Sequence, residues 1–487
     1  MTSQTVSMSN VQNIDGLLSG VRWAGTVMTF GFPTAAADYG DYAHNVDHDN
    51  NPSTPAVSVD ETDQFFALNA QQQAAAQAAF AEFRDLTLMS ALQQEPAGGA
   101  DVRIAMSNSR TPGNTTAYAR YPGDDALAGD SWFNTTDYNT PRLGTYAYQT
   151  FFHEIGHALG LKHGHEADNG NNTVLSSDRD SLEFSTMTYR AYVGHPGGGY
   201  GVTDGHYPQS FMMLDIAALQ YMYGADFSTR DGDTSYRFDP ATGQMFIGSW
   251  AQGVPQDSTG ANVNVLFRSI WDGNGIDTYD FSAYDASRQL AIDLTPGGWT
   301  DVDSDSNFQA ADLRAAAPGT QMARGQVFNA LLFNGDTRSL IENAIGGAGD
   351  DTIRGNQAGN RLEGRAGNDT MEGFDGNDVL DQGNGGGGAY GGNGNDVIWA
   401  GDKADTIDGG AGIDLVNYSR STSGVTIIKP DTEDPVSGKV VGGWATNDTI
   451  VGIEQVIGSA YGDGIDLGAG GNFVGGGGGG GARRGGG

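Results

Sequence analysis

The chain has 487 residues, of which 60 are acidic and 25 basic, so its formal net charge is −35 at pH 7. This charge repels nucleic acid and anionic membranes, and neither is expected as a partner. The length exceeds that of a usual single core and indicates two or three domains, which no disulfide can stabilise because cysteine is absent.

The first 20 residues are polar, and we expect them to be loose. They lack the basic segment and apolar run of a Sec signal peptide, and no stretch of about 20 apolar residues predicts a membrane span. A β-like run begins at Met28 and breaks at Pro33. Helix formers and apolar spacing then predict helices and short strands in alternation. Helices are expected at 70–83, about 149–159 and 213–223, and strands at 102–106, 117–121 and 131–134. Together they predict one α+β domain with a mixed sheet over residues 21–240.

The second predicted helix carries the pattern H-E-x-x-H-x-x-G-x-x-H, formed by His153, Glu154, His157, Gly160 and His163. Residues four apart share a helix face, so His153 and His157 can hold one ion, and Gly160 permits the turn that returns His163. Three neutral imidazoles suit tetrahedral zinc with an open fourth position, beside which Glu154 would act as a general base. Five fixed residue types at this spacing arise by chance in about one chain in 10⁴, so the pattern indicates a catalytic zinc site rather than ordinary core histidines.

Beyond residue 240 the chain changes character, and residues 267–284 and 289–294 predict strands joined by Asp/Gly turns. A nine-residue repeat then runs in one register from Gly346 to Asn417 and approximates G-G-x-G-x-D-x-U-x, where U is apolar. The eighth positions are expected to stack as a thin core: Ile353, Leu362, Met371, Leu380, Ile398, Ile407 and Val416.

The sixth position of each repeat supplies a carboxylate, and stacked turns would place these acids and nearby carbonyls around calcium ions. The acids are Asp351, Asp369, Asp378, Asp396, Asp405 and Asp414, with Asn360 as a neutral substitute and Gly387 as a break. A disordered Gly/Asp linker is the alternative. The strict register and the apolar eighth position favour the folded repeat, although without calcium the crowded acids should repel one another and unfold it.

Both halves of the chain resemble the serralysins, the secreted zinc proteases of the metzincin clan that carry calcium-binding RTX repeats. The resemblance extends from about Gly16 to Gly464 and includes residues 185–189 (STMTY), which look like the Met-turn of that family. It implies that Met187 forms the hydrophobic floor under the metal. It also implies that Tyr189 is a displaceable zinc ligand that assists catalysis.

The resemblance further implies two sets of calcium ligands. One set lies where the two domains meet: Arg230, Gly232, Thr234, Asp272, Asn274, Gly275 and Asp277. The other set occupies the second, fourth and sixth positions of the repeats: Gly347, Gly349, Asp351, Asn356, Ala358, Asn360, Arg365, Gly367 and Asp369, continuing through Asp378, Asp396 and Asp405.

A secreted, monomeric zinc endopeptidase is therefore expected, with one catalytic zinc, several structural calcium ions and extracellular proteins as substrates. By resemblance it leaves a Gram-negative cell through a type I exporter. The expected domains are a pro-segment (1–20), the metalloprotease domain (21–240), a β-rich part (241–345), a parallel β-roll (346–417) and an atypical C-terminal segment (418–487). That last segment lacks the apolar, acidic export signal of the family, and a truncated or frame-shifted gene end would account for this difference. The alternative is a calcium-dependent adhesin or surface-layer protein with a vestigial or self-processing protease domain.

Other polar residues receive structural interpretations. The spacing of His165, His195 and His206 fits no helix face, so we expect solvated loop residues, and Lys162 is expected at the surface. Asp215 begins the third predicted helix and either orients a zinc histidine or caps that helix, with the structural role favoured.

Overall fold

The computed structural model describes residues 1–40, 61–109, 116–168, 170–197, 199–303, 306–428, 438–441, 443–466, 472–475 and 483–484. The chain divides into two compact units. Unit 1 comprises residues 1–229, 254–273 and 310–323, and unit 2 comprises residues 230–253, 274–309 and 324–487. Unit 1 is a mixed α/β domain and unit 2 is rich in β-strands, as expected. Among the described residues, none of the helices combines the length and the apolar character needed to cross a bilayer.

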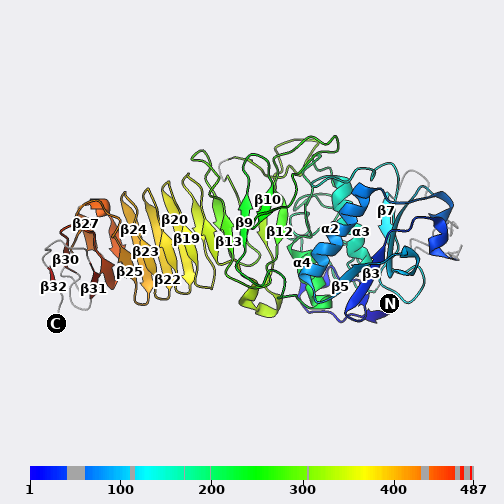
Figure 1. The fold of residues 1–487 in the computed structure, drawn as a ribbon, viewed down its shortest axis with the longest axis horizontal. Helices are drawn as coiled ribbons and strands as arrows, with labels where there is room; N and C mark the ends of the chain where they lie inside the picture. The colour runs from blue at the N-terminus through cyan, green and yellow to red at the C-terminus, as the bar shows by residue number, and fades with distance from the viewer. Residues whose placement is uncertain are drawn as a thin grey trace. The chain divides into compact units, whose positions relative to one another are not determined.

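Unit 1 is built on a sheet with strand order β5-β3-β6-β8-β7, with β4 paired to β6. Figure 1 labels β3, β5 and β7 of this sheet beside helices α2 and α3. Strands β3, β5, β6 and β8 run parallel, whereas β4 and β7 are antiparallel to their neighbours. The strands of unit 1 are β1 (Ser3–Thr5), β2 (Val21–Trp23), β3 (Val27–Gly31), β4 (Phe65–Phe66), β5 (Ser90–Gln93), β6 (Val102–Ser107), β7 (Ala117–Ala119), β8 (Ser131–Phe133) and β12 (Arg268–Ile270). The helices are α1 (Gln12–Asp15), α2 (Ala70–Leu86), α3 (Tyr146–Ala158) and α4 (Met213–Tyr223), with 3₁₀ turns η1 (Ala36–Tyr39), η2 (Glu61–Gln64) and η3 (Ala97–Gly99).

Aromatic packing fixes two helices on this sheet. Phe80 of α2 stacks on Phe30 of β3 at 4.1 Å between ring centroids, and Phe151 of α3 stacks on Phe133 of β8 at 4.2 Å. Stacked rings of this kind add to the free energy gained by burying large apolar surfaces. The helix that carries the zinc motif is therefore anchored on a rigid sheet. The three helices and three strands predicted for this region are all present, with ends shifted by a few residues.

The expectation that residues 1–20 are loose is wrong. Strand β1 pairs antiparallel with β2, and the side chains of Leu17 and Leu18 are fully buried. Two adjacent buried leucines give this segment an apolar anchor that its polar composition conceals. The assignment of residues 1–20 as a removable pro-segment stays a prediction.

Unit 2 contains two long sheets, of 11 and 10 strands, together with smaller elements. Its first strands are β9 (Ser235–Phe238), β10 (Met245–Ile247), β11 (Trp250–Ala251), β13 (Thr278–Asp280), β14 (Ala291–Asp293), β15 (Trp299–Thr300), β16 (Val327–Asn329) and β17 (Asn343–Ile345). The repeat region follows with β18 (Thr352–Arg354), β19 (Arg361–Glu363), β20 (Asp369–Asp375), β21 (Val379–Asp381), β22 (Gly387–Asn393), β23 (Val397–Trp399), β24 (Asp405–Ala411) and β25 (Leu415–Asn417). The last strands are β26 (Thr426–Ile428), β27 (Gly438–Val441), β28 (Thr449–Val451), β29 (Gln455–Ile457), β30 (Gly464–Asp466), β31 (Asn472–Gly475) and β32 (Arg483–Arg484), and the 3₁₀ turns are η4 (Phe333–Gly335), η5 (Thr337–Ser339) and η6 (Gly443–Ala445).

The nine-residue repeats place successive strands alternately in the two long sheets (Figure 1, yellow to orange). Each strand therefore pairs in parallel with the strand two repeats later, 18 residues along the chain: Leu362 faces Leu380, and Leu380 faces Ile398. All seven expected core residues are fully buried, and Ala389 completes the set. Gly387 interrupts the row of sixth-position carboxylates but not the sheet, because it pairs with Asp369 on one side and Asp405 on the other.

The parallel pairing continues past the last repeat. Strand β28 pairs with β24 and β29 pairs with β25, after an interruption at residues 418–448. Within the atypical C-terminal segment (418–487), positions 429–437, 442, 467–471, 476–482 and 485–487 lie outside the described residues.

Candidate metal centre and catalytic site

The three histidines of the motif meet at one point, as the spacing predicted. Helix α3 begins at the N-cap Thr145, whose side chain accepts a hydrogen bond from Tyr148 N, and it carries His153 and His157 one turn apart. The helix ends at Ala158, and Gly160 turns the chain with a φ of 102°. A Cβ at Gly160 would lie 2.3 Å from Val21 O, so both the conformation and the close approach require glycine. This turn brings His163 back beside the helix.

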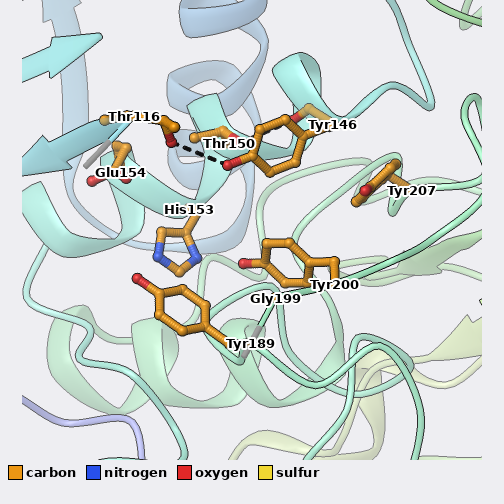
Figure 2. Close-up of a pocket in the computed structure, with 10 residues that line it drawn as sticks. Thr116, Tyr146, Thr150, His153, Glu154, Tyr189, Gly199, Tyr200 and Tyr207 are labelled. Atoms are coloured by element: carbon orange, nitrogen blue, oxygen red, sulfur yellow. Dashed lines mark hydrogen bonds between the residues drawn. The ribbon is translucent and has the colours of Figure 1, made fainter. Parts of the chain in front are cut away.

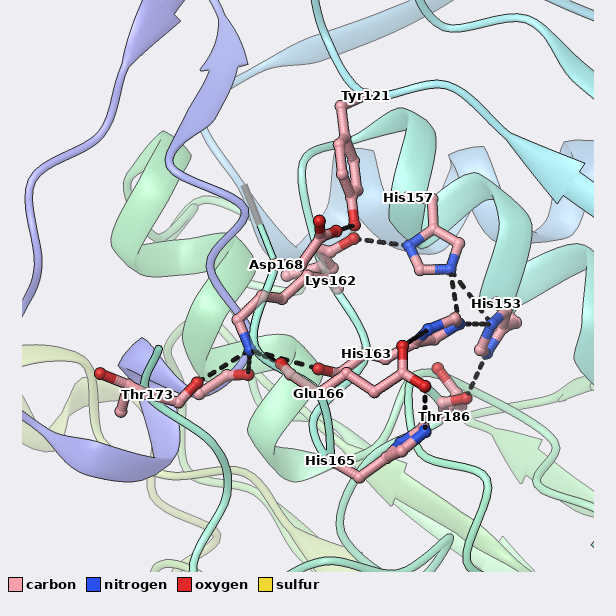
Figure 3. A network of polar contacts seen from close by, with 12 residues as sticks. Tyr121, His153, His157, Lys162, His163, His165, Glu166, Asp168, Thr173 and Thr186 are labelled. Atoms are coloured by element: carbon pink, nitrogen blue, oxygen red, sulfur yellow. Dashed lines mark hydrogen bonds and ion pairs between the residues drawn. The ribbon is translucent and has the colours of Figure 1, made fainter. Parts of the chain in front are cut away.

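The Nε2 atoms of His153, His157 and His163 lie 3.1–3.2 Å from one another (Figure 3). Each Nδ1 faces an oxygen that can only accept a hydrogen bond: Thr186 O at 2.8 Å, Leu161 O at 2.7 Å and a Glu166 carboxylate oxygen at 3.1 Å. In neutral imidazole rings each Nδ1 would then carry the proton, and the three Nε2 lone pairs would converge. Tetrahedral zinc, with Zn–N bonds of about 2.0–2.1 Å, separates its ligand nitrogens by about 3.3 Å, so the donor set fits this ion.

Burial adds to this preference for neutral imidazoles. It lowers the pKa of His153 to about 3, and it lowers the pKa of His157 well below its usual value, with the neighbouring histidines contributing further. A proton on Nε2 would compete with a metal for the same lone pair. The neutral rings of His153 and His157 thus keep their Nε2 lone pairs available to a cation at pH 7.

A second layer of contacts holds the first histidine. The Asp215 carboxylate accepts hydrogen bonds from Ser185 Oγ at 2.6 Å, Thr186 N at 2.7 Å and Met212 N at 3.0 Å. It thereby caps α4 and also holds Thr186, whose carbonyl oxygen accepts the hydrogen bond from His153 Nδ1. Capping of α4 and orientation of a zinc histidine, the two roles that the sequence left open for Asp215, therefore belong to one hydrogen-bond network.

Met187 is fully buried beneath the helix. A Cβ on Gly156 would lie only 2.6 Å from Met187 Sδ, which shows how closely the thioether approaches α3. Within the turn, Met187 N donates to Ser185 Oγ at 3.0 Å. The side chain thus packs closely against the motif helix, and its role as a floor under the metal stays a prediction.

Glu154 lies in a cavity of about 600 Å³ together with His153 (Figure 2). Burial raises the pKa of its carboxyl to about 8. The Oε2 atom is buried and has no hydrogen-bond partner among the described residues. A desolvated carboxylate with an unused oxygen beside a metal site has the position and proton affinity of a general base.

Tyr189 borders the same cavity, with its hydroxyl directed toward the His153 ring (Figure 2). Its ring centroid lies 4.4 Å from that of His163 and 5.7 Å from that of His153. Burial and the Glu154 charge raise the pKa of the phenol, so it stays a hydrogen-bond donor at neutral pH. Tyr146, Tyr200 and Tyr207 complete a largely aromatic wall.

The sequence interpretation missed the role of Glu166 and misplaced His165. The two carboxylate oxygens of Glu166 bridge His163 Nδ1 at 3.1 Å and His165 Nε2 at 3.2 Å (Figure 3). His165 also packs against Tyr189, at 4.8 Å between ring centroids. His165 is therefore part of the surroundings of the site rather than a solvated loop residue. An acid three residues after the last motif histidine is the signal that could have identified Glu166.

The surface assignment of Lys162 is wrong, because its side chain is fully buried. The ammonium group donates hydrogen bonds to backbone carbonyls instead of facing water (Figure 3). His195 and His206 are not part of the triad: the Nδ1 atom of His195 accepts from Gly197 N and that of His206 from Asp312 N.

The sixth-position acids of the repeats form a regular ladder in unit 2. Asp396 Oδ1 accepts from Asp378 N at 2.8 Å, and Asp414 Oδ1 accepts from Asp396 N at 2.9 Å. The Oδ2 atoms of all three are buried and have no hydrogen-bond partner among the described residues. Burial raises the pKa of Asp378 to about 7, because a charged carboxylate is disfavoured there. Buried oxygens without donors are suited to a hard cation.

The other expected calcium residues fall in both units, with Asp272 in unit 1 and the remainder in unit 2. Within unit 2, Thr234 N donates to Asp277 Oδ1 at 2.8 Å, and Ile276 N donates to Asp233 Oδ1 at 3.1 Å. Arg230 adopts a positive φ of 51° in the first of these two turns. The turns at 230–234 and 274–277 therefore lie together, as the assignment requires, although their role in ion binding stays a prediction.

Comparison with known proteins identifies the relatives of this chain. Residues 225–308 match the family described as the C-terminal domain of peptidase M10 serralysins. The chain is 38% identical to serralysin C of Dickeya chrysanthemi over 49% of its own length and 43% of that protein. It is 33% identical to metallopeptidase AprA of Pseudomonas marginalis over 61% of its length and 57% of that protein, and 34% identical to serralysin of Proteus mirabilis over 53% and 47%. The chain thus spans about half the length of the curated relatives that it matches. The resemblance inferred from the zinc motif and the repeats is confirmed, and the matched part of this chain is related to the serralysins.

Proposed function

We propose that this protein is a secreted, calcium-stabilised zinc endopeptidase that hydrolyses peptide bonds in extracellular proteins. The observation that carries the proposal is the convergence of three histidine Nε2 atoms beside the buried carboxyl group of Glu154. The relatives named serralysin and metallopeptidase support the same class of enzyme.

His153, His157 and His163 would hold one zinc ion through Nε2, with Tyr189 as an additional ligand when substrate is absent. When bound, zinc supplies Lewis acidity that polarises the scissile carbonyl and makes a water molecule acidic enough to react near pH 7. The protein residues then move the proton. Glu154 accepts it from the attacking water and returns it to the amine that leaves. Tyr189 Oη donates a hydrogen bond to the carbonyl oxygen as negative charge develops there.

The remaining domains have supporting roles in this proposal. Residues 21–240 hold the catalytic residues in a metzincin-like arrangement, and residues 241–345 are the β-rich part of the C-terminal domain. Residues 346–417 form a parallel β-roll, which is supported by the pairing of strands 18 residues apart. Its Asp ladder binds several calcium ions, which is supported by the buried Oδ2 atoms that have no hydrogen-bond partner among the described residues. Residues 418–487 end the chain. Export by type I machinery is proposed from the resemblance to the serralysins, and the enzyme would act as a monomer.

The direct test replaces Glu154 with Gln, which retains the shape of the side chain but cannot accept the proton. We expect the Glu154→Gln protein to bind one zinc per chain and to lose casein hydrolysis by at least about 10²-fold. Zinc content by elemental analysis and cleavage of labelled casein are measured on the same calcium-loaded preparation. Glu372→Gln, which changes an exposed glutamate of unit 2, is the matched control and should remain active. Full activity of the Glu154→Gln protein would refute the proposal.

A further inference from the structure

Lys162 lies directly before the third motif histidine, and its buried ammonium group joins three separate stretches of unit 1. Nζ donates to Gly16 O at 2.7 Å, to Thr173 O at 2.9 Å, and to His163 O and Glu166 O at 3.2 and 2.7 Å. Gly16 belongs to the N-terminal segment, and Glu166 is the acceptor for His163 Nδ1. One side chain thus connects Gly16 to the loop that follows His163. Figure 3 shows its contacts with Glu166 and Thr173 in that loop.

The backbone of the N-terminal segment pairs with the same loop. Lys162 N donates to Leu17 O at 2.8 Å, Ser19 N donates to Gly160 O at 3.0 Å, and Leu18 and Leu161 form an antiparallel bridge. The buried side chains of Leu17 and Leu18 add apolar contact. The turn from Gly160 to His163 is therefore held by an added strand-like segment that comes from the beginning of the sequence.

The other side of the loop is tied to that segment as well. Asn171 Nδ2 donates to Asp15 O at 2.7 Å and to Leu18 O at 2.8 Å, and Ser176 N donates to Asn13 Oδ1 at 2.9 Å. Residues 12–19 thus contact the chain on both sides of His163, before it and after it. We call residues 12–19, Lys162 and Asn171 the N-terminal clamp.

A buried ammonium is costly unless every proton finds an acceptor, so an apolar residue would be the cheaper way to fill this space. With an apolar residue at position 162, the four carbonyl oxygens around Nζ would lose this hydrogen-bond donor. The charge therefore fixes a geometry that apolar packing alone would leave adjustable, since hydrogen bonds are directional and hydrophobic contacts are not.

We propose that the N-terminal clamp positions His163 for zinc, with Lys162 as its central positioning residue. The inference rests on the proposed zinc site but concerns residues outside the H-E-x-x-H-x-x-G-x-x-H pattern. The inference also limits processing: residues 12–19 must stay in the active enzyme, so a pro-segment can extend no further than Val11 and cannot comprise all of residues 1–20.

The test uses the absence of native cysteine. Lys162→Cys is made in the Glu154→Gln background, which prevents self-digestion, and the unfolded chain is alkylated with 2-bromoethylamine before refolding with calcium. Aminoethylation rebuilds a lysine-like side chain at this one position, whereas iodoacetamide adds a neutral group. Zinc dissociation constants are measured by competition with a chromophoric chelator. Lys403→Cys, at an exposed lysine of unit 2, receives the same treatments as the control.

We expect the Lys162→Cys protein to bind zinc about 10–100-fold more weakly, as when other supporting contacts of a metal ligand are removed. Aminoethylation should restore the affinity and carbamidomethylation should not, while the Lys403→Cys protein stays at the parent value throughout. A residue that only stabilises the fold would lower the melting temperature and leave the zinc dissociation constant unchanged. That result, or equal affinities after the two alkylations, would overturn the proposal.

If the Lys162→Cys chain fails to refold, the Asn171→Ala variant weakens the same clamp more gently. An unchanged zinc dissociation constant in that variant would also overturn the proposal. N-terminal sequencing of active enzyme should find a first residue no later than Gln12, and a later start would contradict the clamp. The outcome is separable from the proposed function. If the Glu154→Gln protein binds zinc but the wild-type protein cleaves no protein substrate, the proposed protease function is refuted. The clamp would still be supported by the zinc dissociation constants of the alkylated Lys162→Cys proteins.

Discussion

In the proposed mechanism, Tyr189 is the residue whose position most directly connects the zinc site to peptide cleavage. Its neutral phenol lies among His153, His163 and His165 and borders the cavity that contains Glu154. A donor in this place can act on the reacting carbonyl oxygen without belonging to the histidine triad.

Replacing Tyr189 with Phe should therefore lower kcat by about 10²–10³-fold, the usual effect of removing one preorganised donor to a developing negative charge. KM should change much less, because the ring that lines the cavity remains. Steady-state kinetics on a fluorogenic peptide, with zinc content determined in parallel, measure both quantities. Tyr192→Phe is the control, since that tyrosine does not line the cavity. An unchanged kcat in the zinc-loaded Tyr189→Phe protein would remove Tyr189 from the mechanism.

At this scale the motif residues were predictable from spacing, whereas their supports were not. His153, His157 and His163 follow from helix geometry and one glycine. The buried position of Lys162 depends on carbonyls that come from Gly16 and Thr173, far apart in the sequence. Local composition contains no trace of such contacts, so a lone lysine in a loop was interpreted as surface charge.

At the scale of secondary structure, regular periodicity gave the most accurate predictions. Ala70–Leu86 and Met213–Tyr223 form helices where helix formers and apolar spacing indicated them. The nine-residue repeat likewise predicted which side chains form the core of unit 2, because glycine turns and one inward apolar residue recur at fixed spacing. The continuation into β28 and β29 was missed, since residues 418–448 interrupt the register that the prediction relied on.

One hydrogen bond shows that the interruption at residues 418–448 leaves the row of aspartate carboxylates in place. Asp448 Oδ1 accepts from Asp405 N at 2.8 Å, as the acid of the next turn does within the repeats. The insertion thus leaves the carboxylate ladder in place, while the spacing of 43 residues hides it from a search for a period of nine. The loose N-terminus was a similar error: pairing between β1 and β2 depends on partners, not on the polarity of residues 1–20.

At the scale of the whole molecule, a small part of the acid forms a buried ladder whose carboxyls resist ionisation. Burial raises the pKa of Asp369 and Asp378 to about 7 and that of Asp405 to about 8. An aspartate in an unfolded chain titrates near 3.9, so the folded state binds these protons more tightly. The stability that they contribute is complete below about pH 4 and is lost as the pH rises through about 7 to 8.

Calcium-free protein should therefore unfold at a progressively lower temperature between pH 5 and pH 8. Bound calcium should oppose this trend, because it stabilises the charged carboxylates, and it should raise the melting temperature most at the higher pH. Thermal unfolding of the Glu154→Gln protein, followed by circular dichroism with and without calcium across this range, measures the effect without self-digestion. A melting temperature that rises with pH in calcium-free protein would contradict the account.

The central claim is that one zinc ion, held by His153, His157 and His163, makes this chain a protease. Its most direct test is the hydrolysis of casein by calcium-loaded protein that has been stripped of zinc, as zinc is returned stepwise. The account predicts no hydrolysis at the start and a rise that saturates at one equivalent of zinc per chain. Hydrolysis that persists in the stripped protein, or a fully loaded protein that leaves casein intact, would contradict it.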